Sequence, residues 1–187
     1  MRRGHRRRQL GQSTVELGIS SIVLLLLLTG LLDLSRAFYF DVGLHNAARE
    51  GARHGAWFDT GARQTLYLDD SDIKSTVDSV LIGSNLPTST LVAGCPGSAP
   101  QHFPTTFSTQ TMKPQLYICY DAQGSAYGAG SIYQGGPPPP RDTSMTGKDL
   151  EVVVTMTYGL VTGLMQGMFP NNFGMVAYQH MTIQGHP

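Results

Sequence analysis

The chain has 187 residues, of which 41% are hydrophobic and 14% charged, with 22 glycines, 11 prolines and two cysteines. This length fits one domain with an appendage and excludes two large domains. Five of the thirteen basic residues are arginines in the first eight positions, so the rest of the chain carries eight basic against thirteen acidic residues. A mildly acidic body argues against a phosphate-binding surface, and we expect no nucleic-acid partner.

An uncharged apolar run follows the basic arm at residues 17–32. It corresponds to ~24 Å of helix, and continuation to Phe40 supplies the roughly 20 residues that a bilayer core requires. Arginines beside such a run predict a cytoplasmic N-terminus. We therefore expect a basic cytoplasmic leader over residues 1–11 and a single membrane-spanning segment over about residues 17–40, with the lipid bilayer as a partner.

The helical pattern continues beyond this segment. Apolar residues recur about every four positions, first at Leu34, Phe38 and Val42 and then at Leu44, Ala48, Ala52 and Ala56. They predict one long helix over residues 12–57, whose amphipathic outer half is covered by the chain's own head domain. Asp33 and Arg36 are three residues apart, so we expect them to pair on one helix face.

Residues 58–187 are predicted to form an extracytoplasmic head domain. The acidic residues Asp69, Asp70 and Asp72 predict the start of a short helix that ends at Gly83. Branched and aromatic residues predict strands over 116–120, 150–158 and 175–183, with a weaker one over 86–93. A proline-rich loop over 135–141 excludes regular structure there. The expected fold is α+β, with a small antiparallel sheet and one short helix on the outer half of the long helix.

The two cysteines are the residues with the clearest chemical role. Cys95 and Cys119 are expected outside the cytoplasm, where disulfides form, and we predict that they are bonded to each other; two unpaired small apolar residues are the alternative. No histidine near them has the spacing of a metal ligand. Because no catalytic motif occurs either, we expect no catalytic residue, no metal and no cofactor.

Glu16 immediately precedes the apolar run. A charged residue at mid-membrane costs ~2.5–3.5 kcal/mol, and less near the interface, so its default interpretation is functional, with a partner. If the chain is cut after Gly11, the new ammonium group of Gln12 lies about one helical turn from Glu16, in the same chain or in a neighbour. A glutamate that tolerates interfacial water, or stays protonated, is the alternative.

A basic leader that ends in Gly11, four residues and then Glu16 resembles the processing site of type IV pilins and pseudopilins. Further along, the sequence reads D-L-S-R-A-F-Y at 33–39 and A-A-R-E-G-A-R at 47–53. These segments are similar to the D-x-x-R-x-x-Y/F and A-A-R-E-G-A-R segments of the TadE-like family, the minor pilins or pseudopilins of the tight-adherence (Tad) pilus. Leu17 departs from the aromatic residue that processed members usually carry.

The resemblance implies a non-enzymatic structural or assembly component of a Tad-type pilus or secretion apparatus in the bacterial cytoplasmic membrane. It implies processing between Gly11 and Gln12 by a prepilin peptidase, with Glu16 setting the axial register of assembly. The implied partners are other pilin or pseudopilin subunits and the inner-membrane assembly platform, with incorporation into an extracellular pilus. An uncleaved, membrane-anchored binding or sensor domain is the alternative function.

The segment 47–53 also has a physical interpretation of its own. Its small residues let another backbone approach closely, while Arg49, Glu50 and Arg53 supply charges that can pair between subunits or with the head. Of these two roles, we expect packing of the head domain onto this segment to be the larger one, because the apolar stripe of the helix must be covered. Together with Asp33 and Arg36, these three residues form the predicted helix interaction segment.

Overall fold

The computed structural model describes residues 6–59, 64–65, 69–92, 95–96, 104, 107–122, 125–127, 149–161 and 172–184. The chain divides into two compact units. The first consists of Met1–Ala37 and Leu160–Asn171, and the second of Phe38–Gly159 and Asn172–Pro187. The expected proline-rich loop over 135–141 and the start of the leader lie outside the described residues.

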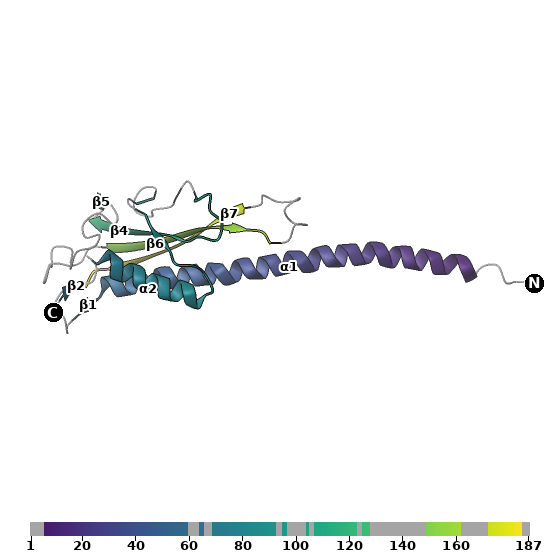
Figure 1. Ribbon diagram of the computed structural model, residues 1–187, viewed down its shortest axis with the longest axis horizontal. Helices are drawn as coiled ribbons and strands as arrows, with labels where there is room; N and C mark the ends of the chain where they lie inside the picture. Colours follow the sequence, from purple (N-terminus) through teal and green to yellow (C-terminus); the bar gives the residue numbers. More distant parts are fainter. Residues whose placement is uncertain are drawn as a thin grey trace, which may run out of the picture. The chain divides into compact units, whose positions relative to one another are not determined.

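Helix α1 runs without a break over Arg6–Ala56 (Figure 1). Twelve large apolar side chains between Val15 and Leu34 are more than half exposed. The described part, Gly11–Ala56, is long and apolar enough to cross a membrane. The predicted long N-terminal apolar helix is therefore confirmed, and its first half buries almost nothing within the chain.

The outer half of α1 belongs to the second unit and buries a face of small residues. This face consists of Leu44 and the small residues Gly43, Ala47, Ala48, Gly51, Ala52, Gly55 and Ala56. A Cβ atom on Gly51 would lie 2.5 Å from Val77 Cγ2 on helix α2, and one on Gly55 would lie 2.5 Å from Leu150 Cδ2 on strand β6. The small residues thus allow α1 to approach both neighbours closely, which confirms the expected seat for the head.

The first part of the predicted apolar stripe is wrong. Leu34, Phe38 and Val42 are 53%, 63% and 58% exposed, whereas Leu44 and the alanines after it are buried. Two residues correspond to about 200° of rotation around a helix, so Val42 and Leu44 point in nearly opposite directions. One continuous stripe therefore could not contain both runs.

Helix α2 spans Asp70–Gly83, as predicted. The Asp69 carboxylate caps its N-terminus by accepting a hydrogen bond from the backbone N–H of Asp72 at 3.0 Å. Its fully buried residues, Ile73, Val77 and Leu81, recur every four positions and therefore share one face. Figure 1 shows α2 and the strands beside the C-terminal part of α1.

The main sheet has the strand order β3-β4-β6-β7, with β5 also paired to β4. Strands β4 (Gln115–Ala122), β6 (Asp149–Gly159) and β7 (Asn172–Thr182) are antiparallel and confirm the three main predicted strands. Strand β5 covers Ser125–Tyr127, while β1 (Phe58–Asp59) and β2 (Gln64–Thr65) form a separate pair. The α+β class is confirmed.

Strand β3 departs from the prediction in two ways. It covers only Thr90–Leu91, and it pairs with β4 in parallel, so the sheet is not wholly antiparallel. Pro87 has no N–H to donate to a ladder. The backbone N–H and the hydroxyl of Ser89 both donate to Asp78 Oδ1 of α2, at 2.7 and 2.6 Å. The expected strand over 86–93 is shortened because α2 takes these hydrogen bonds.

Strand β6 is buried on both faces. Leu150, Val152 and every second residue up to Tyr158 face α1, and the residues between them, Glu151 to Thr157, are buried as well. On this second face the Thr157 hydroxyl donates to the Ser108 carbonyl at 2.6 Å, and Cys119 is bonded to Cys95. The predicted disulfide is confirmed, with a Cα–Cα distance of 5.7 Å.

Candidate functional site

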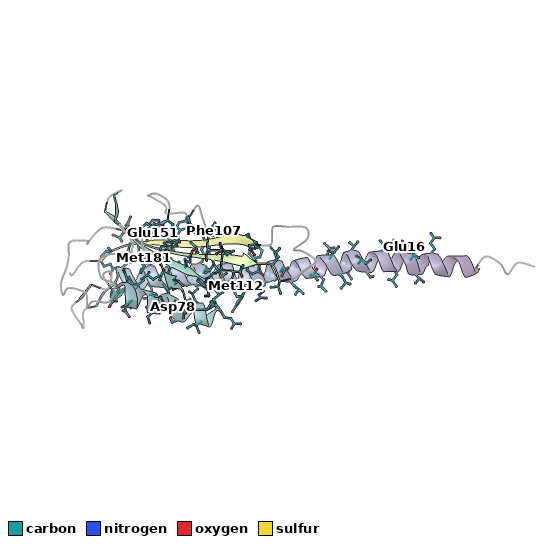
Figure 2. The ribbon with its side chains drawn as sticks, turned by 45° about the horizontal axis from the view of Figure 1, so that its top comes forward. Glu16, Asp78, Phe107, Met112, Glu151 and Met181 are labelled. Carbon is teal, nitrogen blue, oxygen red and sulfur yellow. A yellow bond between two sulfur atoms is a disulfide. The ribbon has the colours of Figure 1, made fainter. Side chains whose placement is uncertain are left out.

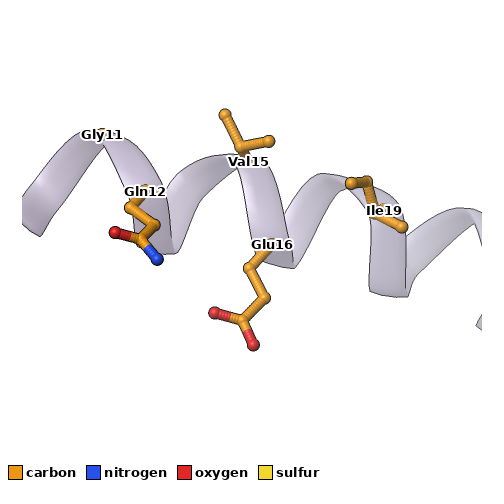
Figure 3. Close-up of a pocket in the computed structure, with 5 residues that line it drawn as sticks. All are labelled: Gly11, Gln12, Val15, Glu16 and Ile19. Carbon is orange, nitrogen blue, oxygen red and sulfur yellow. The ribbon is translucent and has the colours of Figure 1, made fainter.

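The first candidate site is one face of α1 near its start. Gly11, Gln12, Val15, Glu16 and Ile19 line an open surface hollow there (Figure 3). The spacing of these residues places them on adjacent turns of one helix face. In the part of the chain that the structure describes, Gly11 has no neighbour within 4 Å of where a Cβ atom would stand. The Gly11–Gln12 peptide bond therefore lies on an exposed, uncrowded stretch of helix.

Glu16 is exposed on this face. Figure 3 shows its carboxylate on the same side of the helix as the Gln12 amide, one turn away. Among the side chains that the structure describes, none forms an ion pair with Glu16. The arrangement leaves the carboxylate accessible to a cation at the position of residue 12 or on a neighbouring molecule.

Asp33 is the buried acid of the first unit. Its side chain is 5% exposed although it follows the apolar run, and Oδ1 accepts a hydrogen bond from the backbone N–H of Val161 at 3.3 Å. This contact joins residues that are 128 positions apart. Arg36 is exposed on the next turn of the helix. The pairing of Asp33 with Arg36 stays a prediction.

The charges of segment 47–53 lie on the exposed side of α1. Arg53 donates to the Glu50 carboxylate through Nε, at 3.0 Å to Oε2, and also through Nη2. This hydrogen bonding lowers the pKa of Glu50 below its ordinary value. Arg49 is exposed beside the pair. Glu50 and Arg53 thus pair within the chain, and a role of these three residues between subunits stays a prediction.

A contact between the two helices was not predicted. His54 Nε2 of α1 lies 2.7 Å from Asp72 Oδ2 in the first turn of α2. The sequence places both residues at helix ends, but they are 18 positions apart, and no local pattern relates them. The pair links the end of α1 to the start of α2.

A second unpredicted pair lies on the sheet face opposite α1. Glu151 of β6, labelled in Figure 2, is fully buried. Its Oε1 lies 3.2 Å from Nε2 of His180 on β7. The strand register places Cys119 of β4 opposite Glu151 on its other side. Within the described part of the chain, no group of three or more His, Cys, Asp or Glu side chains could hold a metal ion.

A row of aromatic rings also escaped the sequence analysis. Ring centroids are 5.6 Å apart for Tyr39 and Phe40, 6.1 Å for Phe40 and Tyr158, and 5.0 Å for Tyr158 and Phe173. Phe40 and Tyr158 are buried, whereas Tyr39 and Phe173 are exposed. Only the pairing of β6 with β7 and their packing on α1 bring these rings together.

Comparison with known proteins identifies one part of the chain. Residues 11–53 match the TadE-like protein family. No curated protein and no solved structure matches the chain significantly. The matched residues lie wholly within α1 and include Gly11, Glu16, Asp33 and Arg36, together with the segment 47–53.

Proposed function

We propose, from the premise that residues 11–53 form a TadE-like domain, that the chain is a pseudopilin that acts by assembly. It is a non-enzymatic subunit of a Tad-type pilus or secretion apparatus. The observation that carries this proposal is the layout of α1, which joins an exposed apolar half to a half that seats a head domain. Such a helix can be stored in a bilayer and can later pack against other helices.

The proposed location is the bacterial cytoplasmic membrane, crossed once by about residues 17–40. The arginine-rich leader lies in the cytoplasm, as the positive-inside rule requires. The head lies outside, where the disulfide between Cys95 and Cys119 is stable because that compartment is oxidising. Before assembly, the bilayer covers the apolar half of α1.

Maturation proceeds by cleavage after Gly11 by a prepilin peptidase. A glycine in a helix interior costs ~1 kcal/mol relative to alanine, so α1 unwinds more readily at this position than at its non-glycine neighbours. Nothing among the described residues crowds Gly11. Local unwinding would present the Gly11–Gln12 bond to the peptidase and leave Gln12 as the new N-terminus.

Glu16 then acts as the register residue of assembly. The new α-amino group has an ordinary pKa near 7.7–8.0 and is largely protonated at neutral pH. Four residues of helix place it ~6 Å along the axis from Glu16. In lipid, a carboxylate gains most from a cationic partner. Two neighbouring subunits are therefore most stable at the one axial offset that brings the N-terminus of one subunit to Glu16 of the other.

The partners of this function are other pilin or pseudopilin subunits, the prepilin peptidase and the inner-membrane assembly platform. Asp33, Arg36, Arg49, Glu50 and Arg53 form the proposed helix interaction segment. Glu50 and Arg53 already pair with each other, so a second subunit would have to break this contact to bind either of them. Arg49 is therefore the residue of segment 47–53 that can form an ion pair with a second subunit at the lowest energetic cost.

The experiment that tests the proposal replaces Glu16 by glutamine. Glu16→Gln preserves size and removes the charge, while Ser20→Ala changes an exposed polar residue one turn further along the same face. Both variants should reach the membrane fraction like the wild type. Only Glu16→Gln should lower the amount in sheared or purified assemblies, by about tenfold if the lost pairing is worth ~1.4 kcal/mol.

The amounts are measured by immunoblot of membrane and assembled fractions from the same cells. Equal incorporation of Glu16→Gln and wild type would reject the register role. If the wild type is found in the membrane but in no assembled fraction of cells that build the apparatus, the pseudopilin function itself fails.

A further inference from the structure

The head exposes aromatic rings at one end of its sheet. Phe38 and Tyr39 of α1 and Phe173 of β7 are 63%, 53% and 41% exposed. The buried rings of Phe40 and Tyr158 connect Tyr39 to Phe173 through successive ring contacts. We call Tyr39 and Phe173 the aromatic patch. Phe38 lies about 200° around α1 from Phe40 and therefore points away from the sheet.

The patch lies at a defined height along α1. From Leu17, where the apolar run begins, to Phe38 the helix rises ~32 Å, about the thickness of a hydrocarbon core. Aromatic residues at this height match the belt that Trp and Tyr form at membrane interfaces. The helix positions alone therefore place Phe38 and Tyr39 at the outer boundary of the bilayer.

The sequence around Phe173 is unusually free of charge. From Val152 to Gln179 it contains no Asp, Glu, Lys, Arg or His, although 14% of the chain is charged. Burying this region in an apolar phase therefore requires no charge to be desolvated. Tyr39 adds a hydroxyl on an apolar ring, which suits a boundary between lipid and water.

A separate observation comes from the first unit. Two residues after β6 ends, the backbone N–H of Val161 donates to Asp33 on α1, at 3.3 Å. The side chain of Val161 is 57% exposed, and Leu32 and Leu34 beside Asp33 are 60% and 53% exposed. The chain that leaves β6 thus meets α1 at its apolar part.

We propose that the aromatic patch is a second membrane contact, which inserts into the boundary between headgroups and acyl chains of the outer leaflet. The inference rests on the proposed function, since it needs α1 in the membrane. A subunit held in the membrane by both α1 and Phe173 cannot rotate freely about the axis of α1. Its orientation is restricted before the subunit meets its neighbours, and assembly must lift Phe173 out of the lipid.

Depth-dependent fluorescence quenching tests the proposal on the full-length chain. The only tryptophan, Trp57, lies 19 residues beyond Phe38 and is first replaced by phenylalanine. Single tryptophans are then introduced as Phe173→Trp, Ile82→Trp and Leu24→Trp. Ile82 is the matched control, because it is an exposed apolar residue of the head, 59% exposed, on α2. Leu24 reports whether α1 is in the bilayer.

Each variant is reconstituted in vesicles of phosphatidylcholine and phosphatidylglycerol whose acyl chains carry bromine at either carbons 6 and 7 or carbons 11 and 12. For Phe173→Trp we expect about twofold quenching by the shallow bromines and less by the deep ones, as for a residue of the interfacial belt. Leu24→Trp should be quenched by the deep bromines, and Ile82→Trp by neither. Tyr39→Trp, which α1 alone places at this depth, is the positive control for the interfacial belt, and near-ultraviolet circular dichroism of each variant checks that the head is folded.

The outcomes separate the two proposals. Quenching of Leu24→Trp and Tyr39→Trp with no quenching of Phe173→Trp overturns the second membrane contact and leaves the anchor intact. Blue-shifted emission from the Phe173→Trp variant that bromine does not quench means that another copy of the chain covers the patch, which also overturns the inference. If Leu24→Trp is not quenched, α1 is not in the membrane, and both proposals fail.

Discussion

At Gly51 the missing side chain sets the distance between α1 and α2. A Cβ atom there would lie 2.5 Å from Val77 Cγ2, and Val77 is fully buried. Valine is branched at Cβ and has little rotamer freedom in a helix, so it cannot turn away. The small-residue pattern of segment 47–53 is thus explained at this position by packing within the chain.

Replacing Gly51 by alanine should therefore destabilise the head. Overpacking typically costs ~1–3 kcal/mol, and the better helix propensity of alanine returns up to ~1 kcal/mol. Gly83→Ala is the matched control, since Gly83 is also helical but has nothing within 4 Å of its Cβ position. Urea unfolding followed by near-ultraviolet circular dichroism should show a loss for Gly51→Ala only, and equal midpoints for the two variants would contradict the packing account.

The charged residues show which side-chain contacts can be predicted from sequence spacing and which cannot. The spacing of Glu50 and Arg53 allows a pair on one helix face, and they do form one. Asp33, Asp78 and Glu151 also contact residues from other parts of the chain, namely Val161, Ser89 and His180 in that order, although Asp78 pairs with Lys74 of its own helix as well. Sequence spacing predicts neighbours within one helix, but it has no means to find these distant ones.

Among the elements, those with a strong local pattern were predicted well. α2 has an acidic cap and a four-residue apolar spacing, and it ends at Gly83 as expected. Strands β4, β6 and β7 are rich in branched and aromatic residues. Strand β3 was predicted too long because hydrogen bonds from Ser89 to Asp78 replace part of its ladder, and such a contact leaves no local signature.

The disulfide is the element-scale feature with the clearest energetic consequence. It joins residues 24 positions apart and fixes Cys95 to strand β4 on the sheet face opposite α1. The loop-closure model assigns ~3 kcal/mol to a ring of this size. Reduction should therefore lower the thermal midpoint of the head.

A double variant, Cys95→Ser with Cys119→Ser, should unfold at the midpoint of the reduced wild type, because both lack the same cross-link. Adding dithiothreitol to the double variant should change nothing. A midpoint for the double variant equal to that of the oxidised wild type would mean that the cross-link contributes no stability. Calorimetry on the full-length chain in detergent measures all four states.

At the scale of the whole molecule, the match to the TadE-like protein family covers α1 alone, because the matched residues 11–53 lie within this helix. The membrane run and the A-A-R-E-G-A-R segment are local patterns, and sequence reasoning recognised both. The aromatic patch combines α1 with β7, so it depends on how the sheet packs and was not predicted. The side of α1 that carries the head was predicted from Leu44, Ala48, Ala52 and Ala56, and all four residues are buried.

The central proposal is that the subunit is cleaved after Gly11 and then assembles through α1. The most direct test is the intact mass of the chain isolated from assembled material, for the wild type, Gly11→Ala and Gly18→Ala. Gly18 is an equally open helical glycine, with nothing within 4 Å of its Cβ position. We predict that wild type and Gly18→Ala lack residues 1–11 and begin at Gln12, while Gly11→Ala stays uncut and outside the assemblies. Met1 still attached to wild-type chains in functional assemblies would contradict the account and leave an uncleaved, anchored domain.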